Sequence, residues 1–237
     1  MTRRRSGCLV VLLVLLLLLA GVLVVVDRVG KGIAEDRVAE QLADRGGLTG
    51  TPDVQITGFP FLTQALAGDY RDVRIHLTAE QLGQPAGTRA DVSLRGVHVP
   101  LSDALGGSVQ QIPVDRVDGT ATLSYALLAD QLGGDTTLTQ DGDGIRLTKS
   151  VEVLGFDFPV TASGTVALDG QAVVIDVTDV SAGAIDVPRS VVNATEDLLD
   201  FSYQVPALPF GLQLTGVQPA AEGVQVRVAA TDTVLSG

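Results

Sequence analysis

The sequence predicts an α+β fold in which a long curved antiparallel sheet is wrapped by two helices and preceded by one transmembrane helix. Three observations predict it. Residues 8–26 form an unbroken apolar run. Much of residues 54–187 alternates apolar and polar side chains with the period of two that is typical of half-buried strands. Residues 31–45 and 190–201 instead carry apolar side chains at helical spacing.

The apolar run has 19 residues, close to the roughly 20 that a helix needs to cross a bilayer. Arg3, Arg4 and Arg5 precede it and stay in the cytoplasm by the positive-inside rule, so the chain after the run is exported. A cleavable signal peptide has a shorter apolar core and an Ala-x-Ala-like exit, which residues 24–27 lack.

We therefore expect a single-pass protein of the cytoplasmic membrane, with a cleaved signal peptide as the alternative. The expected regions are a basic cytoplasmic stub at residues 1–7, a signal anchor at residues 8–26 and an exported domain at residues 27–237.

The exported part is strongly acidic. It contains all 28 acidic residues and 13 basic ones, which gives a formal charge of −15. Such a surface repels nucleic acid and anionic lipid headgroups, so contact with a membrane has to be driven by apolar burial. The sole cysteine, Cys8, begins the apolar run and leaves the exported domain without disulfides.

The first helix of the exported domain, at residues 31–45, ends at Gly46 and Gly47. Its apolar side is formed by residues four or five apart, namely Val29, Ile33, Val38 and Leu42. The second helix, at residues 190–201, carries its apolar stripe on Val191, Val192, Thr195, Leu198 and Leu199.

Strands occupy most of the chain between these helices. Asp141-Gly142-Asp143-Gly144 and Asp169-Gly170 predict hairpin turns, and residues 78–83 and 126–133 predict short helical turns. At Gly96 the apolar phase changes, which indicates a β-bulge. Two helices are too few to cover the apolar face of eight or more strands, so either the sheet rolls on itself or something else fills the gap.

No pattern in the sequence indicates catalysis. His76 and His98 occupy the polar phase of strands and are interpreted as solvated. Residues 141–146 lack the Gly and the Asp or Asn that a calcium loop requires, and no nucleophile elbow, zinc-protease helix or phosphate-binding loop occurs. We expect a protein that is not an enzyme and needs no cofactor; a carboxylate-based glycan hydrolase is an alternative.

Phenylalanine and proline gather at three corners, residues 58–62, 155–159 and 208–212. Proline removes a ladder donor, so strands stop or turn there. The corners either pack the ends of a rolled sheet or line an apolar cavity for lipid. In the second interpretation the lipid-binding residues are Phe59, Phe61, Leu62, Leu66, Phe156, Phe158, Leu198, Leu208 and Phe210.

Four motifs, in this order and spacing, resemble the actinobacterial LmeA-like phospholipid-binding family over about residues 30–235. They are Gly58-Phe59-Pro60-Phe61-Leu62 with Leu66-x-Gly68 and then Val73-x-Ile75, Gly96-Val97-x-Val99-Pro100-Leu101, the segment 119–125, and Leu208-Pro209-x-Gly211-Leu212 with Gly223-Val224.

The resemblance implies an envelope protein of the tubular lipid-binding type, which holds phospholipid in an elongated apolar groove and has no catalytic residues. A phosphatidylinositol-type lipid is a candidate ligand, because the mycobacterial family is linked to lipoglycans built on it. The alternative function is a non-catalytic scaffold for envelope enzymes.

Overall fold

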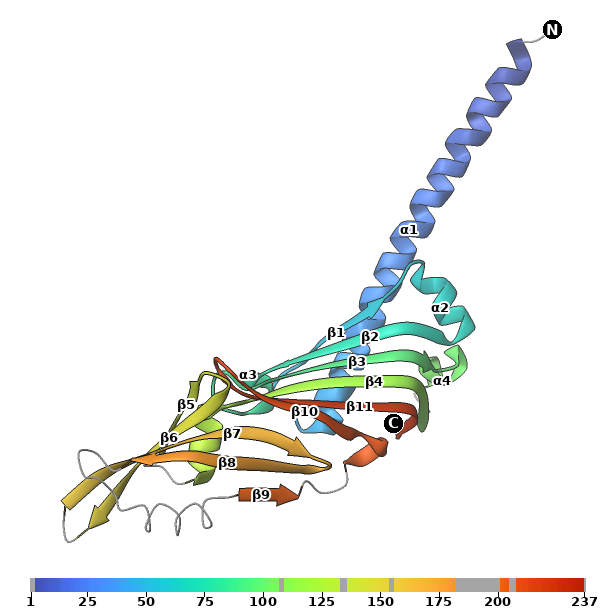
Figure 1. Cartoon of the computed structure of the whole chain (residues 1–237). Helices are drawn as coiled ribbons and strands as arrows, with labels where there is room; N and C mark the ends of the chain where they lie inside the picture. Colours follow the sequence, from blue (N-terminus) through green and yellow to red (C-terminus); the bar gives the residue numbers. More distant parts are fainter. Residues whose placement is uncertain are drawn as a thin grey trace.

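The computed structural model describes residues 3–106, 109–132, 136–153, 156–181, 201–204 and 208–236. Within them the chain forms one long N-terminal helix, two antiparallel sheets and several short helices at the ends of strands (Figure 1). This arrangement confirms the predicted α+β class and the apolar N-terminal helix. No barrel is closed in the described part of the chain.

Sheet A has six strands in the order β1-β2-β3-β4-β11-β10, and sheet B has five in the order β5-β6-β7-β8-β9, as far as the described residues show. The strands of sheet A are β1 Asp53–Thr57, β2 Asp69–Thr78, β3 Arg89–His98, β4 Gln111–Ser124, β10 Gln213–Ala220 and β11 Gly223–Ser236. Those of sheet B are β5 Thr136–Asp141, β6 Gly144–Val153, β7 Phe156–Asp169, β8 Ala172–Ser181 and β9 Phe201–Gln204.

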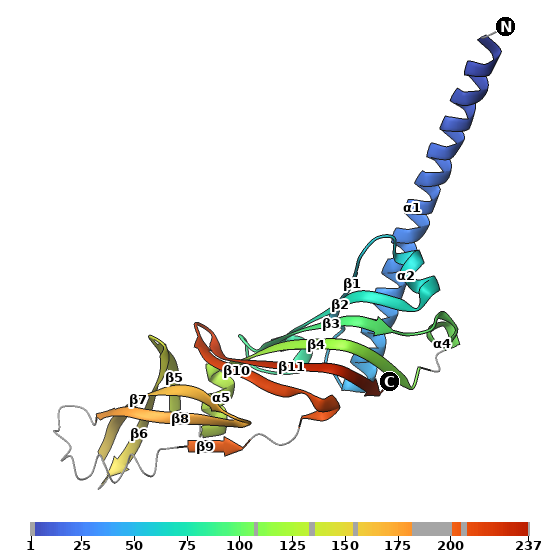
Figure 2. The ribbon, with the colours of Figure 1, turned by 45° about the vertical axis from the view of Figure 1, so that its right-hand side comes forward.

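The division into two sheets differs from the single long sheet that the sequence predicted. Helix α5, Tyr125–Leu132, follows β4 directly and separates it from β5, so the next four strands pair with β5 and with one another. The chain then returns to sheet A with β10 and β11, and β11 pairs with β4. Figure 2 shows sheet B beside the β10 edge of sheet A.

The remaining helices are α1 Arg3–Gly46, α2 Phe61–Ala67, α3 Ala79–Leu82, α4 Leu101–Gly106 and the 3-10 turn η1 Pro209–Gly211. The helical turns predicted at residues 78–83 and 126–133 are confirmed as α3 and α5, and both predicted hairpin turns are present. The helix predicted at residues 190–201 lies outside the described residues except for Phe201, which begins β9.

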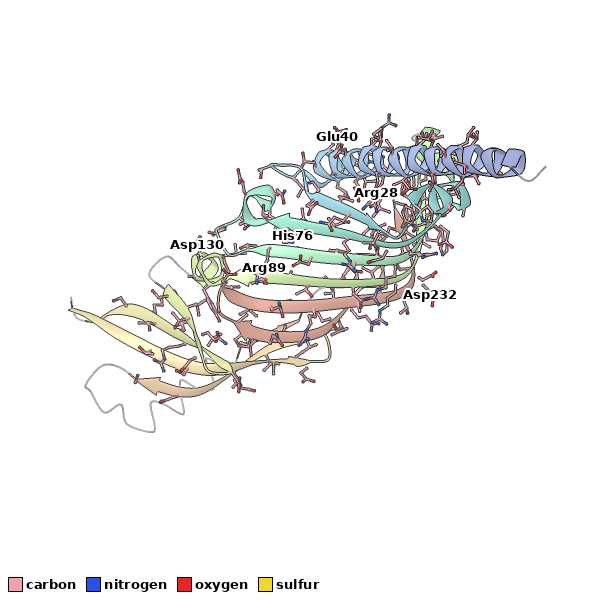
Figure 3. All side chains as sticks on the ribbon, turned by 90° about the horizontal axis from the view of Figure 1, so that it is seen from above. Arg28, Glu40, His76, Arg89, Asp130 and Asp232 are labelled. Atoms are coloured by element: carbon pink, nitrogen blue, oxygen red, sulfur yellow. The ribbon has the colours of Figure 1, made fainter. Side chains whose placement is uncertain are left out.

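The predicted anchor and the predicted helix at residues 31–45 are one continuous helix, α1. Seen from above, α1 lies beyond β1, along the edge of sheet A (Figure 3). The apolar side expected from the sequence is only partly right. Val29 and Ile33 are 57% and 53% exposed, whereas Leu42 packs on the sheet as expected, together with Ala34 and Ala39. The small side chains of the two alanines let the helix approach a strand closely.

Two carboxylates fasten α1 to the sheet domain. Asp27, only 3% exposed, accepts the backbone N–H of Leu62 at 2.8 Å in the first turn of α2. Glu35 accepts the backbone N–H of Ile56 at 2.6 Å. Ile56 lies on an edge strand, whose outward N–H groups have no strand partner. The bond from Asp27 caps the N-terminus of α2. The bond from Glu35 satisfies an N–H group at the open edge of sheet A.

Buried apolar side chains form two clusters on the same face of sheet A. Core 1 lies near α1 and α2 and comprises Ala39, Val54, Ile56, Phe61, Ala65, Val73, Val97, Val114, Val117 and Ala230. Core 2 lies at the other end, where α5 and sheet B pack on β10 and β11, and is centred on Leu138, Ile145 and Val224. The alternation of side chains along β11 places Val224 and Ala230 on one face.

The phase change predicted at Gly96 extends across four strands. Ladder pairing is interrupted at Arg71, Gly96, Asp115 and Asp232, which are neighbours across β2, β3, β4 and β11. The register is the same on both sides of this row, so the expected bulge in a single strand was wrong. Because all four strands change phase together, the apolar face continues across the row, which we name the crease.

Gly96 is the position in the crease where a side chain would be most disruptive. Its φ is 60°, a conformation that costs other residues about 1–2 kcal/mol, and an added Cβ would overlap the side chain of Asp115. Gly170 has the same φ in a turn with open space around it. Alanine substitutions at the two glycines therefore distinguish the cost of backbone strain from the cost of steric overlap.

We predict that Gly96→Ala lowers the free energy of unfolding by about 1–3 kcal/mol more than Gly170→Ala does. Denaturant unfolding of the full-length variants in detergent, followed by circular dichroism, measures the difference. Asp115→Ala should recover part of the loss when combined with Gly96→Ala. Equal losses for the two single variants would contradict the overlap.

Candidate functional site

Between the two cores, sheet A carries half-buried apolar side chains on the same face. Pairing brings them together across the strands: Ile75 lies opposite Val92, and Ala121 lies opposite Val226. We name this set the apolar band. It comprises Ile75, Leu77, Ala90, Val92, Ala121, Leu123, Val226 and Val228.

The apolar band is continuous with both cores. Ile75 and Val92 pack against core 1, and Val226 packs against core 2. Gly119 belongs to the same face, where the Val228 side chain occupies the space that a Cβ would need. The band therefore forms an aliphatic surface without charged or aromatic members.

In the described part of the chain fifteen apolar side chains are buried, and most of them are the small side chains of valine and alanine. α1 contacts β1 and α2, and a helix about 10 Å wide covers about two strands spaced ~4.8 Å apart. Sheet A thus retains apolar area that a ligand with aliphatic chains could cover.

The first predicted corner, residues 58–62, does not bring its apolar residues into one site. Phe61 is 5% exposed in core 1, with its ring centroid 6.2 Å from that of Tyr70, and Leu62 packs against the same core. Phe59 is 53% exposed and Leu66 is 75% exposed. The Arg28 guanidinium lies 5.5 Å from the centre of the Phe59 ring, a cation–π contact.

The other predicted residues lie elsewhere. Leu208 and Phe210 flank the start of η1, and Phe210 is exposed with φ 60°. Phe156 and Phe158 begin β7, opposite Val153 and Val151, but their side chains are outside the described part of the structure, as is all of Leu198. The residues that the structure does describe are not gathered at one place.

The apolar band was not predicted as a candidate site from the sequence. Its members are ordinary strand residues in the apolar phase of β2, β3, β4 and β11, and this alternation was the available signal. Alternation marks the apolar face of a strand, but it does not show which part of that face other elements cover.

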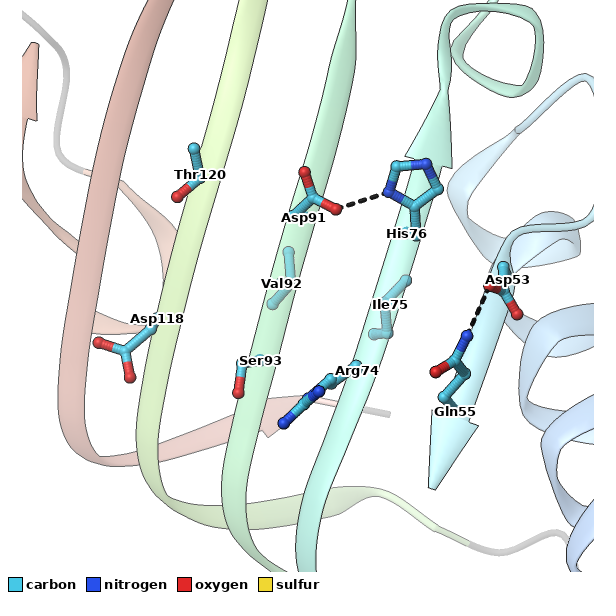
Figure 4. A pocket seen from close by; sticks show the side chains of 10 residues that line it. All are labelled: Asp53, Gln55, Arg74, Ile75, His76, Asp91, Val92, Ser93, Asp118 and Thr120. Carbon is cyan, nitrogen blue, oxygen red and sulfur yellow. Dashed lines mark hydrogen bonds and ion pairs between the residues drawn. The ribbon is translucent and has the colours of Figure 1, made fainter. Parts of the chain in front are cut away.

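The opposite face of sheet A is polar. It holds a shallow depression of about 430 Å³, shown in Figure 4. His76 Nδ1 lies 2.6 Å from Asp91 Oδ1 across β2 and β3. Near the crease, His98 lies 3.1 Å from Asp115. Both histidines are on exposed strand surface, as predicted. Their carboxylate partners lie on the neighbouring strand, far away in sequence, and were not predicted.

The described residues contain no group of three side chains suited to holding a metal ion. The paired charges around the depression stabilise adjacent strands of a solvated face. This face does not match the apolar groove expected from the sequence, so the apolar band is the better candidate site.

Asp72 on this face has a lowered pKa. Burial alone would raise the pKa of its carboxyl, but hydrogen bonds from Ser93, Arg74 and Thr57 and the positive charge of Arg74 together outweigh burial. The Ser93 hydroxyl and the Arg74 Nε each donate at 2.8 Å. Since the folded pKa is below the usual 3.8, the stabilisation is present above that pH and is lost as the pH falls through the folded pKa.

An open antiparallel sheet that keeps an aliphatic surface half covered, with no catalytic constellation in its described residues, has the architecture of a protein that binds apolar ligands. The chain belongs to the LmeA-like phospholipid-binding family, whose sequence model matches residues 25–229. The resemblance recognised from the four motifs is thereby confirmed. Searches of curated proteins and of solved structures gave no match.

We predict that Phe61→Ala lowers the free energy of unfolding by about 3–5 kcal/mol, because it removes a buried ring from core 1. Leu66→Ala, a matched change on the exposed side of the same helix, should alter it by less than about 0.5 kcal/mol. Denaturant unfolding of the full-length protein in detergent gives both values. Comparable losses would show that Leu66 is packed.

We also predict that Asp72→Asn destabilises the protein by about 1 kcal/mol at pH 7 and by less at pH 3. At neutral pH the carboxylate accepts its three hydrogen bonds in the ionised form, whereas at low pH the wild-type carboxyl approaches the neutral state that the amide imitates. Urea unfolding of both proteins at the two pH values tests this. A difference independent of pH would contradict it.

Proposed function

We propose that the protein is a membrane-tethered, extracytoplasmic phospholipid-binding protein that sequesters or transfers lipid acyl chains, without catalysis, in maintenance of envelope lipids or lipoglycans. Membership of a phospholipid-binding family supports lipid as the ligand. The single observation that carries the assignment of the site is the apolar band, which is aliphatic and half-buried and lies on the apolar face of sheet A.

The chemistry of the apolar band suits acyl chains. Burying one methylene contributes about 0.8 kcal/mol, so ten contribute about 8 kcal/mol. That is enough to offset the repulsion between an exported part of charge −15 and an anionic headgroup, which water and salt weaken. A phosphatidylinositol-type headgroup is one candidate under this proposal. The corner residues Phe156, Phe158, Leu198 and Leu208 remain candidates for further lipid contact.

The proposed tether is the first part of α1. This helix is long and apolar enough to cross a membrane. A division into a cytoplasmic stub at residues 1–7, an anchor at residues 8–26 and an exported domain at residues 27–237 agrees with a family match that begins at residue 25. Arg3, Arg4 and Arg5 support a cytoplasmic N-terminus. A cleaved signal sequence is the alternative topology.

We predict that Ala121→Gln on the apolar band lowers the phospholipid that co-purifies with the full-length protein several-fold. Thr120→Gln is the matched control, because it places the same side chain on the next residue of β4, on the polar face. Lipid extracted per mole of protein, purified in mild detergent, is counted by mass spectrometry. Lipid held around α1 is common to both variants, so equal amounts in the two would contradict a site on the band.

A further inference from the structure

Three exposed apolar side chains lie on the segments next to the place where α1 leaves the sheet domain. Phe59 precedes α2, Leu66 lies on α2, and Leu105, which is 70% exposed, lies on α4. α2 contacts both α1 and α4, and Figure 1 shows α2 and α4 together at the end of sheet A from which α1 emerges. We name these three residues the shoulder.

The shoulder lies close to the end of the apolar run of α1. The carboxylate of Asp27, the residue after that run, binds the N–H of Leu62, and a Cβ at Gly30 would be 3.7 Å from the Leu62 side chain. A helix rises 1.5 Å per residue, so residues 27–30 lie about 2–6 Å beyond Val26. The headgroup layer of one leaflet is about 5–8 Å thick, which includes this level.

Exposed apolar side chains on the opposite side of α1 indicate the same position for the bilayer interface. Val22, Val26, Val29 and Ile33 are exposed and follow one another at helical spacing, so the apolar surface of the run continues past Asp27 on the side that faces away from the sheet domain. An apolar stripe of this kind is stable when lipid rather than water covers it. The bilayer interface is therefore expected at the level of residues 27–33.

Each charged residue at the start of this level has a partner. Asp27 binds the N-terminus of α2, Arg28 lies over the Phe59 ring, and Lys31 Nζ lies 3.4 Å from Glu35 Oε1. Charged groups at membrane depth are tolerated when they are paired or reach the interface. The pairing of these three residues agrees with an interfacial position.

We propose that the shoulder inserts into the interfacial layer of the bilayer that α1 spans and seats sheet A against the membrane, so that phospholipid passes between the outer leaflet and the domain. The inference rests on the proposed function for the tether and for the lipid. Apolar burial drives the contact, as the acidic charge of the exported part requires.

Single tryptophans test the insertion, because the chain has no tryptophan of its own. Full-length Leu66→Trp and Leu105→Trp are reconstituted into phosphatidylcholine vesicles with or without acyl chains brominated near the headgroup. We expect bromine to quench their emission at least twofold. Thr139→Trp, at an exposed position of β5 in sheet B, is the control and should not be quenched.

Quenching at residues 66 and 105 no greater than at residue 139 would overturn the proposal. A blue-shifted but unquenched emission would also overturn it, because it would mean that a protein surface, such as a second copy of the chain, covers the shoulder.

A second measurement separates seating from binding. Full-length Leu66→Gln/Leu105→Gln should take up phospholipid from its host vesicles several-fold more slowly than wild type, yet bind the same amount at saturation from detergent micelles. An unchanged uptake rate, or reduced binding at saturation, would contradict seating by the shoulder. If wild type bound no phospholipid, the proposed function would fail, whereas quenching would still decide whether the shoulder inserts.

Discussion

The carboxylate of Asp27 is the contact on which the arrangement of the rest depends. It is buried directly after the apolar run and holds the N-terminus of α2, and Glu35 binds the edge strand two turns further along the same helix. A hydrogen bond to a charged group contributes about 1.5–3 kcal/mol, roughly twice a neutral one. The helix proposed as the membrane anchor therefore also stabilises sheet A by packing against its edge. Ala34, Ala39 and Leu42 of that helix reach core 1 because it continues unbroken past Asp27.

Sheet A is only half covered because the elements that cover it pack at its two ends. α1 closes the β1 edge and contacts β1 and α2, and sheet B with α5 packs at the other end, against β10 and β11. The coordinated phase change at the crease keeps one apolar face along the whole length of β4 and β11. The apolar band is the portion of this face that lies between the two covered ends.

Local chemistry in the sequence predicted the strands, the hairpin turns, α3 and α5, because alternation, Asp-Gly pairs and glycine ends act within a few residues. The division into two sheets was not predictable in this way, since it depends on strands far apart in sequence. The buried side of α1 was predicted only in part, because Val29 and Ile33 look like a core stripe in isolation but are exposed, whereas Leu42 packs on the core. Phe59 and Phe61 are alike as residue types, and only the docking of α2 on α1 buries one ring and exposes the other.

Under the proposed function, tethering changes what the lipid site has to achieve. A free domain with the charge of residues 27–237 would meet an anionic membrane rarely, because long-range repulsion lowers the rate of encounter. If α1 is the tether, no such encounter is needed, since a linked domain faces the membrane at a high effective concentration set by the length and stiffness of the link. Under the proposed function the apolar band then needs only modest affinity for acyl chains, which suits a half-buried surface of aliphatic side chains. Weak aliphatic contact also permits release, so the same band could give up a lipid as readily as it accepts one.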